Sequence, residues 1–184
     1  MSKLRKFCAY RNMKRAYTRK SKFRAKSFIR ASPVTRIVRF DMGNLVKTDW
    51  PVKMHLVCRL DLNIRDNALE SARQVANKLM EGQVGVDNFH LRIRVFPHHM
   101  MRENPIAAGA GADRISTGMS QSFGKVIGLA ARVYKNTPIF EISTTPQFAD
   151  KAKEALTKAS KKMPASYSII VTRNALKAAA VAAQ

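Results

Sequence analysis

The chain has 184 residues, and its 34 Lys and Arg against 12 Asp and Glu give a formal net charge of +22 at pH 7. A chain of this length can form one domain with a sizeable core, and no run of about 18 apolar residues is present to span a bilayer. So much positive charge repels itself unless a polyanion neutralises it, and basic residues that meet phosphates release condensed counterions. The composition therefore excludes a membrane-spanning protein and predicts a soluble protein that binds nucleic acid.

The N-terminal stretch is the most basic part of the chain. Its first forty residues hold fourteen Lys or Arg and no acid, and Asp41 is the first acid. We assign residues 1–33 to a basic RNA-binding arm, because aromatic residues interleaved with basic ones suit an extended segment that stacks on exposed bases. An acid-poor N-terminus rich in Arg and Ser is also typical of organelle transit peptides, and composition alone leaves that alternative open. The aromatic residues of the arm are Phe7, Tyr10, Tyr17, Phe23 and Phe28.

A strand and a helix are predicted after the arm. Apolar and polar residues alternate over residues 54–62, which predicts a strand with one buried face. Apolar residues then recur at helical spacing over residues 69–80, until glycines interrupt the pattern. Asp66 or Asn67 can provide the N-cap of this amphipathic helix, because short polar side chains accept hydrogen bonds from the first free N–H groups.

The strand, helix, strand order is completed and then repeated. Residues 87–96 alternate again, with a basic outer face, and Pro97 ends that strand. In the C-terminal part, residues 139–144 predict a strand, residues 148–163 a Lys-rich helix with an apolar stripe, and residues 167–171 a last strand.

These elements form two βα-type halves that share one sheet system. We therefore assign residues 34–172 to a single globular domain of the α+β class. Residues 173–184 form an Ala-rich tail with little to anchor it, so we expect the tail to fray or to lie against RNA.

A glycine-rich loop is predicted between the two halves. We place it at residues 102–119 and expect a short basic strand after it, because glycine permits close approach of the backbone to a partner. The run from Gly109 superficially resembles a dinucleotide fingerprint, but Arg114 occupies the third glycine position, and Gly124-Lys125 lacks the spacing of a phosphate loop. Nucleotide-dependent catalysis is therefore not expected. Five of the eight glycines fall in or near this loop: Gly109, Gly111, Gly118, Gly124 and Gly128.

The residues that carry metal or acid–base chemistry are sparse. Cys8 and Cys58 lie far apart, and the four histidines, with His98 and His99 adjacent, show no metal-ligand spacing. An RNA-modifying enzyme needs a cofactor loop or an acid–base constellation, and the sequence indicates neither. We expect no metal, no cofactor and no catalytic residue. A free-standing DNA-compacting protein shares the charge and is the alternative, although it does not need a glycine-rich loop.

Several short runs resemble one protein family. They are Ala16-Tyr17-Thr18-Arg19, Phe40-Asp41-Met42-Gly43, Ala68-Leu69-Glu70, Ala76-Asn77-Lys78, Phe89-His90 with Arg92, Arg94 and Pro97, Arg102-Glu103-Asn104, GAGADRISTG from Gly109 to Gly118, Phe123-Gly124-Lys125 and Ala130-Ala131-Arg132-Val133. In this order, over about residues 16 to 172, they resemble the L-sixteen family of large-subunit ribosomal proteins, in its archaeal and eukaryotic L-ten-e branch. Because the first run lies in the arm, the resemblance favours an RNA-binding arm over a transit peptide.

The resemblance implies a structural protein of the cytoplasmic ribosome without catalytic activity. It implies a two-layer α/β sandwich of the hammerhead type, embedded in 23S-like rRNA near the 5S rRNA side, with tRNA and neighbouring ribosomal proteins as partners and no homo-oligomer. Loop 102–119 is then expected near the tRNA acceptor end and the peptidyl-transferase centre, and the protein is expected to join late in subunit assembly. The residues that we assign to this tRNA-proximal loop are Arg102, Asn104, Gly109, Gly111, Asp113, Arg114 and Gly118.

Three residues depart from the family pattern as this resemblance gives it. Pro105 stands at a usual Lys, Ser120 at a usual basic residue and Val126 at a usual Pro, and the first two changes remove positive charge from the loop. Residues 1–15 and 20–32 are more basic than the usual arm, which predicts extra rRNA contacts. Our candidates for rRNA contacts are Arg15, Tyr17, Arg19, Arg24, Arg36, Arg39, Arg92, Arg94, Lys125 and Arg132.

Overall fold

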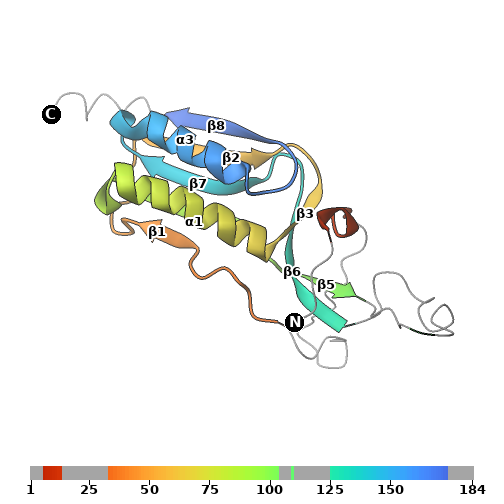
Figure 1. The fold of residues 1–184 in the computed structure, drawn as a ribbon. Coiled ribbons are helices and arrows are strands. Elements are labelled where there is room, and N and C mark those ends of the chain that lie inside the picture. The colour runs from red at the N-terminus through yellow and green to blue at the C-terminus, as the bar shows by residue number, and fades with distance from the viewer. Residues whose placement is uncertain (1–5, 14–32, 104–108, 110–124, 174–184) are drawn as a thin grey trace.

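The structure of the chain is a computed structural model that describes residues 6–13, 33–103, 109 and 125–173 (Figure 1). The larger of its two sheets has five strands in the order β1-β4-β7-β2-β8, and the smaller has three in the order β3-β6-β5. Two α-helices in the described chain accompany them. The elements are β1 (Asp41–Gly43), β2 (Val52–Cys58), β3 (Leu62–Arg65), α1 (Asp66–Gln83), β4 (Phe89–Ile93), β5 (His99–Glu103), β6 (Lys125–Val133), β7 (Pro138–Thr144), α3 (Ala149–Ser160) and β8 (Tyr167–Arg173), with 3-10 turns at Phe7–Ala9, Val86–Asn88 and Pro146–Phe148.

The two predicted halves interleave in the larger sheet. Strands β2 and β4 both pair antiparallel with β7, so that β2-α1-β4 is a split βαβ unit with β7 in its gap. In the same way β7 and β8 both pair with β2, and β7-α3-β8 closes around β2. The predicted strands at 87–96, 139–144 and 167–171 correspond to β4, β7 and β8. The prediction of an α+β fold with two halves in one sheet is confirmed.

Both helices lie side by side on one face of the larger sheet (Figure 1). The helical spacing seen in the sequence buries the apolar stripe of each helix, and the alternation in β2, β4 and β7 buries one face of each strand. Each large side chain buried in this way contributes roughly 1.5–3 kcal/mol. The core between the layers includes Leu56, Leu69, Ala72, Ala76, Met80, Phe89, Leu91, Phe140, Ile142, Ala152, Ala155, Leu156 and Ala159.

The start of α1 differs from the prediction. Arg65 is the N-cap, with an extended backbone and no side-chain cap, whereas Asp66 and Asn67 are already helical. The prediction that Asp66 or Asn67 caps the helix is therefore wrong. Asp66 instead accepts two backbone N–H groups, that of Asn67 at 2.8 Å and that of Arg36 at 3.2 Å. Its charge still lies in the first turn, where the helix dipole favours an acid.

Residues 54–62 are not one strand. Strand β2 ends at Cys58, and β3, which belongs to the smaller sheet, begins at Leu62. Between them Leu60 is 44% exposed, and Asp61 Oδ1 accepts the backbone N–H of Lys135 at 2.6 Å. The alternation of apolar and polar residues continues through this turn, which is why the sequence indicates an unbroken strand.

Strand β3 of the smaller sheet leads directly into α1, because β3 ends at Arg65 and α1 begins at Asp66. Strand β6 lies in its centre, and Leu62, Ile64, Ala131 and Val133 join β3 and β6 to the main core. Within the described residues, no helix is long and apolar enough to cross a membrane.

Candidate nucleic-acid interface

The face of the larger sheet that the helices leave uncovered carries charged side chains from adjacent strands. One row across the sheet places His55 of β2 beside Glu141 of β7, Arg92 of β4 and Asp41 of β1. Successive side chains of a strand point to opposite faces, so Arg92 points away from the helices while its neighbour Leu91 is buried beneath them. We call this surface the open face. The predicted basic outer side of β4 is confirmed.

Each acid of the open face lies beside an arginine. Asp41 Oδ1 is 3.3 Å from Arg92 Nε and 3.2 Å from His90 Nε2. Glu141 Oε2 is 2.9 Å from Arg94 Nη1. The Arg92 and Arg94 side chains remain 53% and 45% exposed, so each pair contributes at most about 1 kcal/mol. A phosphate group can therefore reach both guanidinium groups.

An aromatic stack follows the arginines along the chain. The Phe96 ring centroid lies 5.4 Å from that of Phe40, with 20° between the planes, and 4.5 Å from that of His98. Phe96 is 46% exposed, and Ile93 N donates to Phe40 O at 2.8 Å, which ties Phe40 to the end of β4. An exposed ring among basic residues suits stacking on an unpaired base. Sequence reasoning missed this stack, and the one signal for it was an aromatic residue directly before Pro97.

Two acids of α1 hold the segment before β1 along the helix. The carboxylate of Asp66 accepts the N–H of Arg36, and that of Glu70 accepts the N–H of Val38 at 3.3 Å. With the backbone fixed in this way, the side chains of Arg36 and Arg39 are exposed. Both predicted contacts are thus available on the surface, on a segment separate from Arg92 and Arg94.

The two tethering acids have different electrostatic surroundings. Burial raises the pKa of Asp66, although the N–H groups that it accepts oppose this effect. Hydrogen bonds from Arg73, at 2.6 and 2.8 Å, lower the pKa of Glu70. The same contact raises the pKa of Arg73. The charge of Arg73 is therefore engaged within the fold.

Two of the residues predicted for the loop lie in the described chain, Arg102 on β5 and Gly109 after it. Arg102 pairs with Val126 of β6. The prediction that the loop begins at Arg102 is wrong, because Arg102 and Glu103 belong to β5. Gly109 is exposed and has a φ of 130°, a backbone conformation that favours glycine.

Arg132 belongs to β6 and pairs with Asn63 of the neighbouring strand β3. His99 of β5 lies near it, and its pKa is lowered, first by burial and second by the charge of Arg132. His99 is therefore held neutral near pH 7. The positive charge at this point of the smaller sheet belongs to Arg132.

Part of the predicted arm belongs to the fold. Phe7 lies in the 3-10 turn and packs against the core. The Arg65 guanidinium lies 5.1 Å from the centre of the Tyr10 ring, and Asn63 donates to Tyr10 O at 3.1 Å. Phe7 and Tyr10, predicted to stack on RNA bases, therefore also have partners within the protein.

Other predicted contacts lie outside the described residues. The described chain brings Arg92 and Arg94 together, places Arg36 and Arg39 on another segment, and leaves Arg132 in the smaller sheet. The contacts that lie outside are Arg15, Tyr17, Arg19 and Arg24 of the arm, Asn104, Gly111, Asp113, Arg114 and Gly118 of the loop, and the side chain of Lys125, the first residue of β6.

Within the described ranges, no three His, Cys, Asp or Glu side chains gather in a way that could hold a metal ion. Cys8 and Cys58 are both free, and burial raises the pKa of the Cys58 thiol. A thiol of this kind is a packing residue rather than a nucleophile.

The chain is similar to ribosomal proteins over most of its length. Residues 13–170 match the family model described as ribosomal protein L16p/L10e. The chain belongs to the L16p/L10e family. It is 46% identical over 165 residues to large ribosomal subunit protein uL16 of Methanoculleus marisnigri, which covers 89% of this chain and 93% of that protein. The uL16 proteins of Archaeoglobus fulgidus (45% over 164 residues, 89% and 90% covered) and Methanococcus aeolicus (47% over 173 residues, 94% and 96%) are similar to the same extent.

Membership in the L16p/L10e family identifies the chain as a structural protein of the ribosome and not an enzyme. It confirms the resemblance that the short runs of the sequence indicate. It also implies that the chain binds rRNA, and it sets aside the DNA-compacting alternative.

Proposed function

We propose that this chain is a structural constituent of the large ribosomal subunit and that its open face contacts large-subunit rRNA together with the aromatic stack. The observation that carries the proposal is the pair of exposed arginines, Arg92 and Arg94, followed by the exposed ring of Phe96. Guanidinium groups match phosphate oxygens in pairs, and an exposed ring accepts an unpaired base. This combination suits a looped or bulged RNA segment better than a regular duplex.

Further contacts extend this interface. Arg36 and Arg39 are exposed on the segment before β1, and Arg132 lies in the smaller sheet. The arm, residues 1–33, supplies Arg15, Tyr17, Arg19 and Arg24, and β6 supplies Lys125. The globular part is residues 34–172 and the tail is residues 173–184. Support for these assignments comes from the excess of basic residues in the arm and from the family's occurrence in the ribosome.

The loop after β5 is the second part of the proposal. We assign residues 104–119 to the tRNA acceptor end and the peptidyl-transferase region, with the 5S rRNA side and neighbouring ribosomal proteins as further partners and late entry into the subunit. Strands β5 and β6 lie together at one end of the molecule (Figure 1), which is the arrangement that such a loop needs. The hammerhead sandwich is supported by two layers of sheet and helix. Pro105 in this loop and Ser120 just after it predict fewer phosphate contacts than relatives make.

The test is sedimentation of cell extracts on sucrose gradients at rising salt, with tagged wild-type protein, Phe96→Ala and Tyr134→Ala. Tyr134 is a matched control because it is 54% exposed and has no part in the stack. Loss of one stacked base costs about 1–3 kcal/mol, so Phe96→Ala should leave the large subunit at lower salt than the wild type and Tyr134→Ala. Wild-type protein that migrates free of the large subunit would contradict the function, and equal release of the two variants would contradict the role of the stack.

A further inference from the structure

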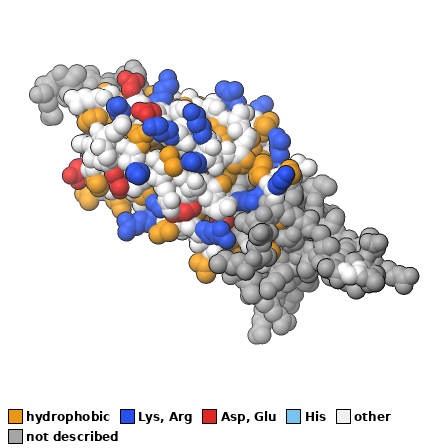
Figure 2. Space-filling model, in the orientation of Figure 1, with side chains coloured by type: hydrophobic (Ala, Val, Ile, Leu, Met, Phe, Trp, Pro, Cys, Tyr) orange, Lys and Arg blue, Asp and Glu red, His pale blue; other side chains and the backbone are white. Residues whose placement is uncertain are grey.

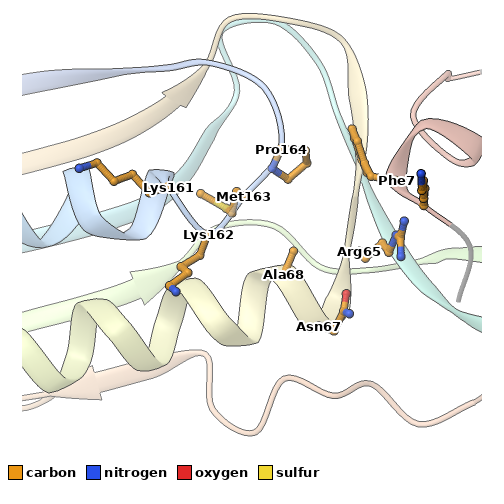
Figure 3. Close-up of a pocket in the computed structure, with 9 residues that line it drawn as sticks. Phe7, Arg65, Asn67, Ala68, Lys161, Lys162, Met163 and Pro164 are labelled. Atoms are coloured by element: carbon orange, nitrogen blue, oxygen red, sulfur yellow. The ribbon is translucent and has the colours of Figure 1, made fainter. Parts of the chain in front are cut away.

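A cleft lies where the start of α1, the end of α3 and the segment 6–13 meet, away from the open face (Figure 3). Its volume is about 520 Å³, within the range of sites that hold small ligands. Lys162 points from the chain after α3 toward α1, Ala68 of α1 lies beside it, and Phe7 and Arg65 lie on the facing side of the cleft (Figure 3). We call it the cationic cleft, and the lining residues that matter here are Lys6, Phe7, Arg65, Asn67, Lys161 and Lys162.

The charged side chains that line the cleft are all positive. Four of them are Lys or Arg, and no Asp or Glu is among the described lining residues. Asp66 lies close in sequence, but it is 3% exposed and its carboxylate accepts the N–H groups of Arg36 and Asn67. A concave surface lined by one sign of charge concentrates its field. The helix-covered side also shows Lys and Arg spread over its surface with fewer acids among them (Figure 2).

The floor of the cleft adds hydrogen-bond donors to this charge. Ala68 lies in the first turn of α1, where backbone N–H groups have no carbonyl partner within the helix, whereas the N–H of Asn67 is already accepted by Asp66. The Nε of Arg65 is buried and has no hydrogen-bond acceptor among the described residues. An anion in the cleft would meet both kinds of donor.

The wall of the cleft formed by segment 6–13 is held in place by one buried residue. Asn63, which is 5% exposed, donates to Tyr10 O at 3.1 Å and to Asn12 O at 3.2 Å, and accepts nothing from them in return. Its backbone N–H also donates to Arg11 O at 3.2 Å. These three bonds fix the course of the segment that carries Lys6.

We infer that the cationic cleft binds a phosphate of the rRNA backbone. The two walls, with Lys6 and Arg65 on one side and Lys162 on the other, suit a backbone strand that passes between them. The inference rests on the proposed function and adds a contact at the ends of the helices, remote from the open face. RNA is the ligand that fits this chain, because a ribosomal protein is surrounded by a dense supply of phosphates.

The experiment compares two double variants of the full chain for binding to large-subunit rRNA over a series of KCl concentrations. Lys6→Gln with Lys162→Gln removes two charges from the cleft. Lys151→Gln with Lys153→Gln removes two exposed charges from α3 outside it. Each lost phosphate contact lowers the salt slope by about 1, so the cleft pair should lower it by about 1 while the control pair leaves it near the wild-type value. Equal slopes for the two variants would overturn the inference.

A second measurement uses unmutated protein, so that no variant has to fold. Lysines are acetylated with and without bound rRNA, and the modified sites are read by mass spectrometry. Lys6 and Lys162 should be protected by rRNA more strongly than Lys151 and Lys153, and equal modification of all four would overturn the inference. Wild-type protein that does not bind rRNA at all would contradict the proposed function as well. Wild-type protein that binds rRNA without protecting Lys6 and Lys162 would contradict only the inference about the cleft.

Discussion

The open face and the cationic cleft handle positive charge in opposite ways. On the open face Arg92 and Arg94 each lie within 3.3 Å of a carboxylate that the protein itself supplies. In the cleft, four basic side chains line a concave surface to which no described acid contributes. The count of 34 Lys and Arg treats the basic residues of both sets alike.

The difference teaches that the number of basic residues does not by itself measure RNA affinity. A paired arginine must give up its carboxylate before it gains a phosphate, so its net contribution is the difference between the two contacts. An unpaired cation in a cleft replaces only its counterions and water, and it gains the full salt-dependent term. We therefore expect the cleft to contribute more affinity per charge, and the open face to contribute orientation.

The largest effect is expected from Gly43→Ala, which should disturb the open face and spare the cleft. Gly43 has a φ of 86°, and an added Cβ would lie 2.3 Å from Phe89 O. The clash and the strain should lower the free energy of unfolding by about 3 kcal/mol and displace β1, which carries Asp41. Urea unfolding followed by fluorescence of Trp50, the single tryptophan, measures this change because the ring is 2% exposed.

Gly82→Ala is the matched control for this substitution. Gly82 lies within α1, and an added Cβ would meet nothing within 4 Å. Alanine in a helix should raise the free energy of unfolding by roughly 0.5–1 kcal/mol. If both substitutions change stability in the same direction, the close packing of β1 against β4 is not the constraint that we describe.

A smaller effect is expected from Glu141→Gln. This substitution should raise the affinity for rRNA, whereas the substitutions in the cleft should lower it. The substitution removes the charge that lies 2.9 Å from Arg94 and 4.0 Å from His55. Freed from its partner, Arg94 should bind rRNA more strongly, by at most about fivefold, which corresponds to the 1 kcal/mol of an exposed pair. The dissociation constant for large-subunit rRNA measures this gain.

Glu154→Gln changes the net charge by the same amount at a different place. Glu154 lies on α3 and pairs with Lys158 at 2.8 Å, far along the chain from the open face. Both variants should bind rRNA more tightly because their net charge is higher, and the gain in affinity should be larger for Glu141→Gln. Equal affinities of the two variants would mean that pairing on the open face does not restrain Arg94.

The sequence predicts the layers of this molecule well and its surfaces poorly, for a physical reason. The periodicity that places Leu69 and Ala76 in the core is local, so a single stretch of sequence shows it. Leu60 follows the same alternation, yet it is exposed because the chain leaves one sheet for the other at that point. Alternation reports which side of a strand is apolar and does not report where the strand ends.

The surfaces depend on residues that are distant in sequence. Phe40 meets Phe96 only because β1 pairs with β4, and Lys6 lines the same cleft as Lys162 only because Asn63 holds the N-terminal segment. Sequence reasoning identified Arg92 and Arg94 from alternation, but it had no means to find their carboxylate partners. It missed the aromatic stack and the cleft for the same reason.

The smallest effect is expected at His99, a residue whose positive charge the fold suppresses. Burial and the nearby Arg132 lower the pKa of His99, so the folded protein binds this proton less readily than the unfolded chain, whose histidine has a pKa of about 6.5. As the pH falls below about 6.5 the unfolded state takes up the proton first, and the free energy of unfolding should decrease until the folded pKa is reached.

Unfolding in urea, followed by Trp50 fluorescence at about pH 7.5 and 5.5, should show this loss in the wild type and a smaller loss in His99→Gln. Every other titrating group is common to the two proteins, so equal losses would mean that His99 protonates freely in the fold. Arg132→Gln should reduce the loss only in part, because burial is the larger cause of the shift. At neutral pH the positive charge beside His99 is therefore that of Arg132, and acidification adds a second charge there only at the expense of the fold.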